Sequence, residues 1–160
     1  MSTENSKRSD EAQIRALIDR WLAAIRSKDL DGIMSCYSPD VLLFDLLPPL
    51  RYAGADAYRK NWGEWFATFD GPVGYEIRDL TLTTDNNVAF THSVNRISGK
   101  RTDGGETEVW VRATVCYRKI DGKWMIAHEH VSVPFYMDSG KASVDLKPQL
   151  FGLNSSTPLA

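Results

Sequence analysis

The chain has 160 residues, of which 42% are hydrophobic and 25% are charged, and its formal net charge is −2 at pH 7. This length suits one domain that buries roughly 70% of its unfolded surface. Such a domain needs no disulfide bond or structural metal for its stability. Acidic and basic residues are interspersed, which predicts no binding surface for nucleic acid or for an anionic membrane. The two cysteines lack metal-type spacing, so we expect free thiols in a reducing compartment.

Two features argue against a targeting or membrane-spanning segment. The N-terminal residues are polar and hold no apolar core of a signal peptide. The most apolar run, residues 41–50, is interrupted by Asp45 and by two prolines, and it is too short to span a bilayer. We therefore expect a cytoplasmic protein.

The first part of the chain carries helical patterns. Asp10 begins a capping-box-like sequence that predicts the start of a first helix, and Asp29 is expected to cap a short second helix. Gly54 opens a third helix with a stripe of aromatic residues at steps of three and four. The stripe consists of Tyr58, Trp62, Trp65, Phe66 and Phe69.

The second part of the chain is predicted to be almost entirely strand. The expected strands cover residues 75–83, 88–98, 106–120 and 124–133, and a short one covers residues 41–45. Three helices followed by an antiparallel meander predict an α+β domain with the helices on one face of a curved sheet. We assign residues 1–9 to a flexible N-terminus, residues 10–136 to the domain and residues 137–160 to a tail.

Two expected hairpins decide which side chains share the face that the helices cover, called here the inner face. A two-residue turn at Asp121-Gly122 brings His128 and His130 onto the inner face. A second turn at Gly104-Gly105 brings His92 onto the same face. A slip of one residue in either register would move these side chains to the other side.

The opposite, outer face of the predicted sheet is mixed in character. Trp110 and Arg112 lie there among hydroxyl groups and paired charges. Such a surface suits a polar subunit interface better than a core. We therefore expect a homodimer through the outer face.

Asp45 is the first candidate for chemistry. It lies between Val-Leu-Leu-Phe and Leu-Leu-Pro-Pro, the most apolar surroundings in the chain. A carboxyl group in such surroundings suits general acid or base catalysis. The alternative is a carboxylate that caps a nearby backbone amide at the end of a strand.

The histidines form the second candidate group. His128 and His130 are two residues apart, and His92 is expected about two strands away. They could contact a ligand or serve only structure, transfer a proton, or hold a zinc ion. No carboxylate partner for a zinc-bound imidazole is visible, so we expect no metal and no cofactor.

Aromatic side chains are the third feature. By default they belong to the core, but five tryptophans in this length also suit a pocket for a small apolar or aromatic molecule. Tyr58 and Tyr117 could donate a phenol hydrogen to a ligand oxygen. The expected pocket residues are Trp21, Tyr58, Trp62, Trp65, Phe66, His92, Val115 and Tyr117.

Four stretches carry a resemblance to a known family. They are Arg-Ser-Lys-Asp-Leu-Asp-Gly-Ile-Met at 26–34, Tyr-Ser-Pro-Asp-Val at 37–41, Tyr-Ala-Gly at 52–54 and Asp-Gly-Lys-Trp-Met-Ile-Ala-His-Glu-His at 121–130. Over residues 10–136 the chain resembles the SnoaL-like and ketosteroid-isomerase-like branch of the nuclear transport factor two-like superfamily. The resemblance implies a cone of three helices on a strongly bent sheet, a deep apolar pocket and frequent dimers.

The resemblance also implies roles for three residues. Asp45 matches the family's proton-shuttling aspartate, nine positions before Gly54. Trp21 occupies the place of the oxyanion tyrosine, and Val115 that of a second, protonated acid. Loss of an oxyanion donor typically costs a factor of ~100 or more, so authentic ketosteroid isomerase activity is not expected.

Members of this branch include isomerases, polyketide cyclases, dehydratases and non-catalytic ligand binders or association modules. The first hypothesis is an enzyme that moves a proton next to a carbonyl, with Asp45 as base and His128 or His130 as acid or orienter. The alternative is a non-catalytic dimeric module that binds a small ligand or mediates association.

Overall fold

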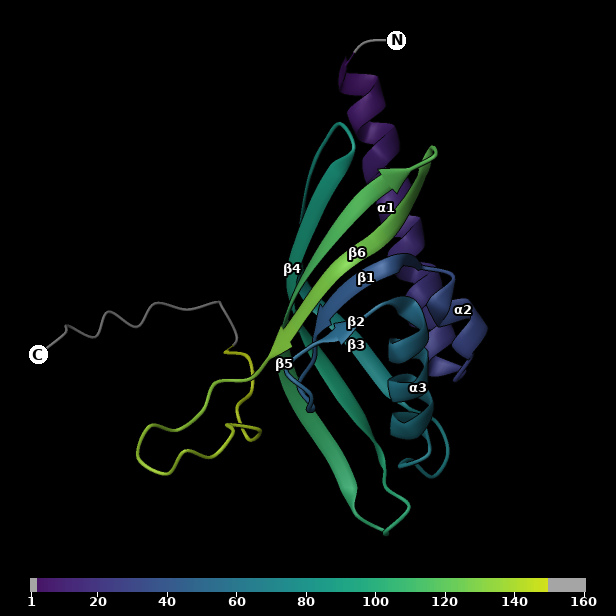
Figure 1. The fold of residues 1–160 in the computed structure, drawn as a ribbon. Helices are drawn as coiled ribbons and strands as arrows, with labels where there is room; N and C mark the ends of the chain where they lie inside the picture. Colours follow the sequence, from purple (N-terminus) through teal and green to yellow (C-terminus); the bar gives the residue numbers. More distant parts are fainter. Residues whose placement is uncertain (1–2, 150–160) are drawn as a thin grey trace, which may run out of the picture.

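The computed structural model describes residues 3–149, which form three helices and six strands. The helices are α1 (Thr3–Arg26), α2 (Leu30–Met34) and α3 (Ala55–Phe66). The strands are β1 (Tyr37–Phe44), β2 (Tyr52–Ala53), β3 (Gly74–Asp85), β4 (Val88–Lys100), β5 (Glu106–Ile120) and β6 (Lys123–Ser132). They confirm the predicted α+β class (Figure 1). None of the helices in this part of the chain has the length and hydropathy of a membrane-spanning segment.

The first helix begins at Thr3 and not at Asp10, so residues 3–9 are helical where the sequence predicted a flexible segment. Its exposed first turns carry an ion pair between Glu4 and Arg8, one turn apart, at 3.8 Å. Asp10 does not cap the helix. Its carboxylate is buried, forms an ion pair with Lys119 and accepts a hydrogen bond from Trp124 Nε1 at 3.0 Å.

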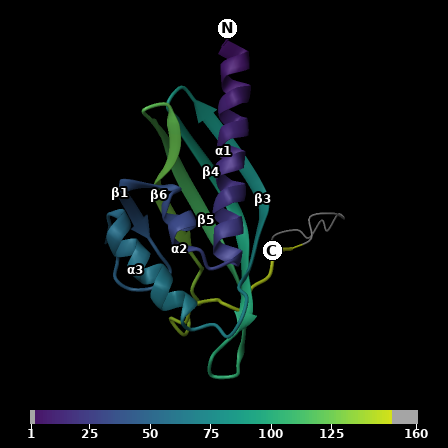
Figure 2. The ribbon, with the colours of Figure 1, turned by 90° about the vertical axis from the view of Figure 1, so that its right-hand side faces the viewer.

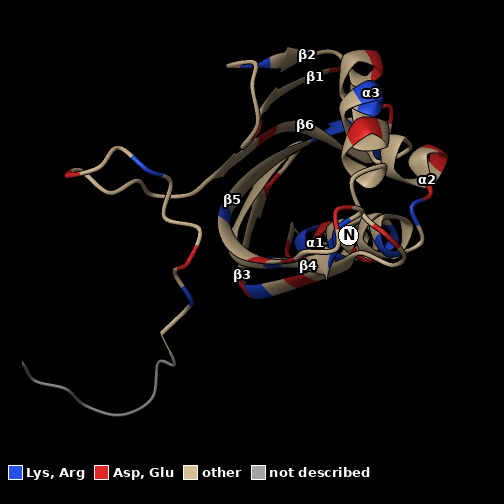
Figure 3. Cartoon of the chain, turned by 90° about the horizontal axis from the view of Figure 1, so that it is seen from below, with Lys and Arg blue, Asp and Glu red and all other residues tan. Residues whose placement is uncertain are grey.

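The six strands form one mixed sheet in the order β2-β1-β6-β5-β4-β3. β1 runs parallel to β6, and the other neighbouring pairs are antiparallel. The sheet curves around the helices, which lie in its concave side (Figure 3). α1 packs on β3 and β6, while α3 packs on β1 and β2 (Figure 2). This arrangement confirms the expected cone.

The turn between β4 and β5 differs from the prediction. The N–H of Arg101 donates to the carbonyl of Gly105 at 2.6 Å, and Lys100 pairs with Glu106. The loop therefore spans residues 101–105, and the pairing is displaced by three residues from the expected Asp103-Glu106 pair. Because an odd displacement reverses the two faces of a strand, the whole of β4 is turned over.

The turn between β5 and β6 is the predicted two-residue hairpin, because Ile120 pairs with Lys123. Both turn residues have positive φ, +50° and +78°, as the tight hairpin requires. The register changes a few residues later, however. Tyr117 pairs with Ile126 but Cys116 pairs with His128, so Ala127 is an extra, bulged residue. Beyond this bulge, odd-numbered residues of β6 face inward.

The segment after β6 folds back along the end of that strand. The N–H of Ser143 donates to the carbonyl of Pro134 at 2.8 Å, and Ser143 is buried. Val144 reaches the inner side of the sheet, although half of its surface stays exposed. The expected packing of Leu150 and Phe151 lies outside the described residues.

Candidate functional site

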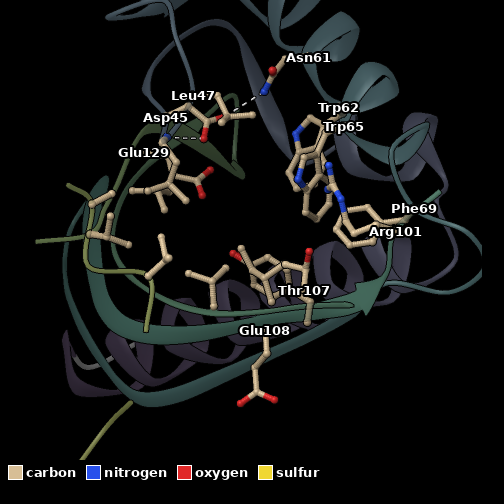
Figure 4. A pocket seen from close by; sticks show the side chains of 18 of the residues that line it. Asp45, Leu47, Asn61, Trp62, Trp65, Phe69, Arg101, Thr107, Glu108 and Glu129 are labelled. Atoms are coloured by element: carbon tan, nitrogen blue, oxygen red, sulfur yellow. Dashed lines mark hydrogen bonds between the residues drawn. The ribbon is translucent and has the colours of Figure 1, made fainter. Parts of the chain in front are cut away.

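A pocket of about 540 Å³ lies between α3 and the concave face of the sheet (Figure 4). This volume is in the range of pockets that hold a small organic molecule. Its aromatic wall consists of Tyr58, Trp62, Trp65, Phe69 and Tyr75. Its aliphatic wall includes Ile97, Val109, Val131 and Val133, and its polar groups include Asp45, Asn61, Arg101, Thr107 and Glu129.

Asp45 lies in this pocket, directly after β1, and it is partly buried. Its Oδ1 accepts the backbone N–H of Leu46 at 2.6 Å, and its Oδ2 accepts Asn61 Nδ2 at 2.9 Å. The hydroxyl of Tyr52 contacts Asn61 Oδ1 at 3.0 Å, which fixes the orientation of the amide. Asp45 thus caps a backbone amide and also faces the cavity, so the two interpretations of this residue are compatible.

Glu129 is the second carboxyl group in the pocket, and the sequence analysis missed it. The bulge at Ala127 turns it inward, and its side chain is only 3% exposed. Burial raises the pKa of Glu129 to about 7; the hydrogen bond from Tyr37 lowers it in part, and the negative charge of Asp45 raises it. Near pH 7 this carboxyl group is therefore protonated in roughly half of the molecules.

A chain of hydrogen bonds supports Glu129 from behind. Tyr37, at the start of β1, donates its hydroxyl hydrogen to Glu129 Oε2 at 2.9 Å. Trp21 Nε1 in turn donates to the Tyr37 hydroxyl oxygen at 3.0 Å. The indole of Trp21 is therefore committed to Tyr37 and does not donate directly to a ligand in the pocket.

The expected pocket residues are divided between different environments. Tyr58, Trp62 and Trp65 line the large pocket. Trp21, Val115 and Tyr117 instead line a second cavity of about 20 Å³, which Glu129 also borders and which has room for about one water molecule. Phe66 is buried in the core beside Trp62 and outside the lining of the large pocket.

Two polar groups on the aromatic wall are suited to donate hydrogen bonds. Burial raises the pKa of Tyr58, and the charge of Glu129 raises it further, so its phenol stays a neutral donor. Trp62 is 6% exposed, and its ring N–H has no partner among the residues that the structure describes. A ligand oxygen could satisfy this N–H, since an unpaired buried donor costs about 1 to 3 kcal/mol.

The expectation that the three histidines face the pocket is wrong. His128 Nδ1 and the carbonyl oxygen of Leu42 are 2.6 Å apart, and its ring centroid lies 4.9 Å from that of Phe44 on the outer side. His130 is exposed and also packs against Phe44. His92 is exposed because β4 is turned over. Within residues 3–149, no cluster of histidine, cysteine or acidic side chains is arranged to hold a metal ion.

The comparison with protein families decides the assignment. The model described as the SnoaL-like domain matches residues 14–136. The chain belongs to the SnoaL-like family. The predicted membership is thereby confirmed. Val115, at the position where the resemblance implied a second acid, pairs across the strands with Glu129 on β6. No protein of curated function matches the chain.

Solved structures of related proteins agree with the SnoaL-like fold. A nuclear transport factor two-like protein of unknown function from Pseudomonas putida KT2440 is 37% identical, with a TM-score of 0.81 over 88% of this chain and 98% of that one. A ketosteroid isomerase-like protein from Erwinia carotovora atroseptica is 24% identical, with a TM-score of 0.65 over 76% and 93%. A protein of unknown function from Mycobacterium tuberculosis is 20% identical, with a TM-score of 0.70 over 85% and 83%.

Proposed function

We propose that this SnoaL-like protein is a cofactor-independent enzyme that moves a proton next to the carbonyl group of a small apolar or aromatic molecule. The reaction is of the isomerase, cyclase or dehydratase type. One observation carries the proposal: Asp45 and the buried Glu129, with a pKa of about 7, lie in the same ring-lined pocket. Two carboxyl groups in such different environments suit a division into base and acid.

In the proposed reaction Asp45 is the base. It takes a proton from the carbon next to the carbonyl, and the electron pair of the broken C–H bond moves toward the carbonyl oxygen. The amide of Asn61 holds the carboxylate in place through Oδ2. In an isomerase-type reaction Asp45 then returns the proton to the same carbon or to a conjugated one. Any proton that Glu129 has given to the carbonyl oxygen goes back to Glu129 as the C=O bond re-forms, so the protein is unchanged after each cycle.

Glu129 in its protonated form is the acid. It donates a hydrogen bond or a proton to the carbonyl oxygen, where negative charge develops. The buried position makes this donation strong, because few water molecules compete for the oxygen. Tyr58 is placed to give a second donor on the aromatic wall. Removal of one such donor typically lowers the rate by a factor of ~100 or more.

The alternative is a pocket that binds a small molecule without catalysis. Aromatic and aliphatic walls alone would serve such a binder, and it would need neither carboxyl group. The substitution Asp45→Asn therefore distinguishes the two functions. A binder keeps its ligand affinity, whereas the enzyme loses most of its rate.

The test uses β-tetralone, a small aromatic ketone, as the probe. The protein is incubated with it in heavy water, and proton NMR follows the replacement of hydrogen by deuterium next to the carbonyl. We expect the wild type to accelerate the exchange, Asp45→Asn to lower the rate by a factor of ~100 or more, and Glu129→Gln to lower it as well. His130→Gln, on the outer face, is the matched control and should leave the rate unchanged. Equal exchange in wild type and Asp45→Asn would refute the proposal.

A further inference from the structure

Arg101 is a cation held at the wall of the pocket. It follows β4 in the loop of residues 101–105 and is half-buried. Its guanidinium carbon lies 5.0 Å from the ring centroid of Phe69, and Nη1 donates to Thr68 Oγ1 at 2.8 Å. These two contacts fix the position of the side chain, and the hydrogen bond uses one of its five N–H donors.

The remaining donors of Arg101 have no acid to bind. Among residues 3–149, Arg101 forms no ion pair, and the same holds for Arg15, Arg20, Arg26, Arg51 and Arg112, so its place in the pocket is what distinguishes it. It is also the one Lys or Arg side chain in the lining of the pocket within the described part of the chain. A half-buried guanidinium fork without a carboxylate has donors that suit the bidentate binding of an anion.

The position of Arg101 in the pocket is opposite to that of the two carboxyl groups. Figure 4 shows Arg101 beside Trp65 and Phe69, while Asp45 and Glu129 lie together on the other side of the cavity. The hydroxyl of Thr107, also in the lining, lies near the Arg101 end. Arg101 therefore lies on the aromatic side of the pocket, across the cavity from Asp45 and Glu129.

We infer that Arg101 binds a carboxylate group of the ligand, so that the pocket takes an aromatic or apolar carboxylic acid whose reactive carbonyl lies at Asp45 and Glu129. The position of the carbonyl at Asp45 and Glu129 rests on the proposed function, whereas carboxylate binding by Arg101 does not. A guanidinium can bind both carboxylate oxygens at once, which orients the ligand as well as holding it. The distance across the pocket keeps the ligand's charge away from the two acids.

Two further acids border the pocket, and neither occupies Arg101. Glu108 pairs with Arg96 at 2.8 Å and Lys147 at 3.6 Å, and its side chain points away from the cavity in Figure 4. Glu106 is exposed, so water and salt screen its charge. Its repulsion of an anionic ligand is therefore weak, and Glu106→Gln should increase the affinity for an acid slightly.

A cationic ligand is the competing possibility, because aromatic walls with nearby carboxylates can hold an amine. Arg101 would repel such a ligand. The test therefore compares three probes of nearly equal shape by calorimetry: naphthylacetate, its neutral amide naphthylacetamide, and the cation naphthylethylammonium. We expect the wild type to bind the acid about tenfold more tightly than the amide, since hydrogen bonds to charged groups are the stronger ones.

The variants locate the effect. Arg101→Gln should remove the preference for the acid while binding of the amide stays unchanged, which shows that the pocket is intact. Arg101→Lys should keep part of the preference. Equal binding of acid and amide by the wild type, tighter binding of the cation, or no binding of any probe would each overturn the inference.

The failure of this inference can be separated from that of the proposed function. Glu129→Gln should keep the preference for naphthylacetate, because Arg101 is not altered. A clear acid preference without proton exchange on β-tetralone would support carboxylate binding by Arg101 and contradict the proposed proton transfer. Proton exchange without an acid preference would support the proposed proton transfer and contradict carboxylate binding by Arg101.

Discussion

Val115 on β5 and Glu129 on β6 are direct partners across the two strands. The family resemblance assigned a second acid to the position of Val115, which has no acidic group. The neighbouring strand supplies one instead, through a bulge that turns Glu129 into the pocket. A carboxyl group can thus reach the interior from a different strand than the resemblance implies.

Stability should depend on pH through Glu129. The pKa of Glu129 is about 7 in the folded protein, compared with 4.5 for a solvent-exposed glutamate as in the unfolded chain, so the folded protein holds the proton more tightly. The resulting contribution is fully present below about pH 4.5 and is lost as pH rises through about 7, in total about 3 kcal/mol. Urea unfolding of wild type and Glu129→Gln at about pH 5 and about pH 8 measures it. An identical change in both proteins would contradict the burial of Glu129.

The substitution Tyr37→Phe should raise the pKa of Glu129 further. The hydroxyl of Tyr37 donates to the carboxyl group and so favours its charged form. Its removal should shift the Glu129 titration upward by about one pH unit, followed by carbon NMR of the side-chain carboxyl. The variant also leaves Trp21 Nε1 without its partner, which should destabilise the protein by about 1 to 3 kcal/mol. A titration that stays in place would exclude this role for Tyr37.

Asn61→Ala tests the positioning of Asp45. The variant removes the donor to Oδ2 but keeps the backbone donor to Oδ1. We expect a loss in exchange rate smaller than that of Asp45→Asn, of about tenfold, with little change in the affinity for β-tetralone. Lys60→Ala, an exposed neighbour on the same helix, is the control. Equal rates in both variants would show that Asn61 does not position the base.

We propose, as the sequence led us to expect, a homodimer through the outer face of the sheet. Trp110 is half-buried there under the guanidinium of Arg78, and Arg112 is exposed. The turned-over β4 adds Phe90, 45% exposed, to this face. Light scattering should give a dimer for the wild type and a monomer for Trp110→Glu. A monomeric wild type would refute this proposal.

The presence of three helices and of the antiparallel hairpins could be predicted, because hydrophobic periodicity and turn residues report on local structure. The register of β4 could not, since Gly104 and Gly105 suit both a two-residue turn and the longer loop that begins at Arg101. Gly104 lies inside that loop with a φ of +89°, a backbone conformation that glycine adopts without strain. One wrong turn was enough to place His92 on the wrong face.

The inward turn of Glu129 left a trace in the sequence. The inward apolar residues of β6 are first Trp124 and Ile126, at even positions, and then Val131, at an odd one, followed by Val133 directly after the strand. Such a change of parity within one strand indicates a bulge between the two sets. Strict alternation from Trp124 instead placed His128 and His130 inside. Asp45 was easier to find, because its apolar neighbours on both sides are adjacent in the chain.

The central claim is that Glu129 acts as the protonated partner of Asp45, and the pH dependence of proton exchange on β-tetralone tests it most directly. The account predicts that the wild-type rate falls as pH rises through about 7, where Glu129 loses its proton, and that Glu129→Gln exchanges more slowly without this fall. The same decline with pH in wild type and Glu129→Gln would contradict it.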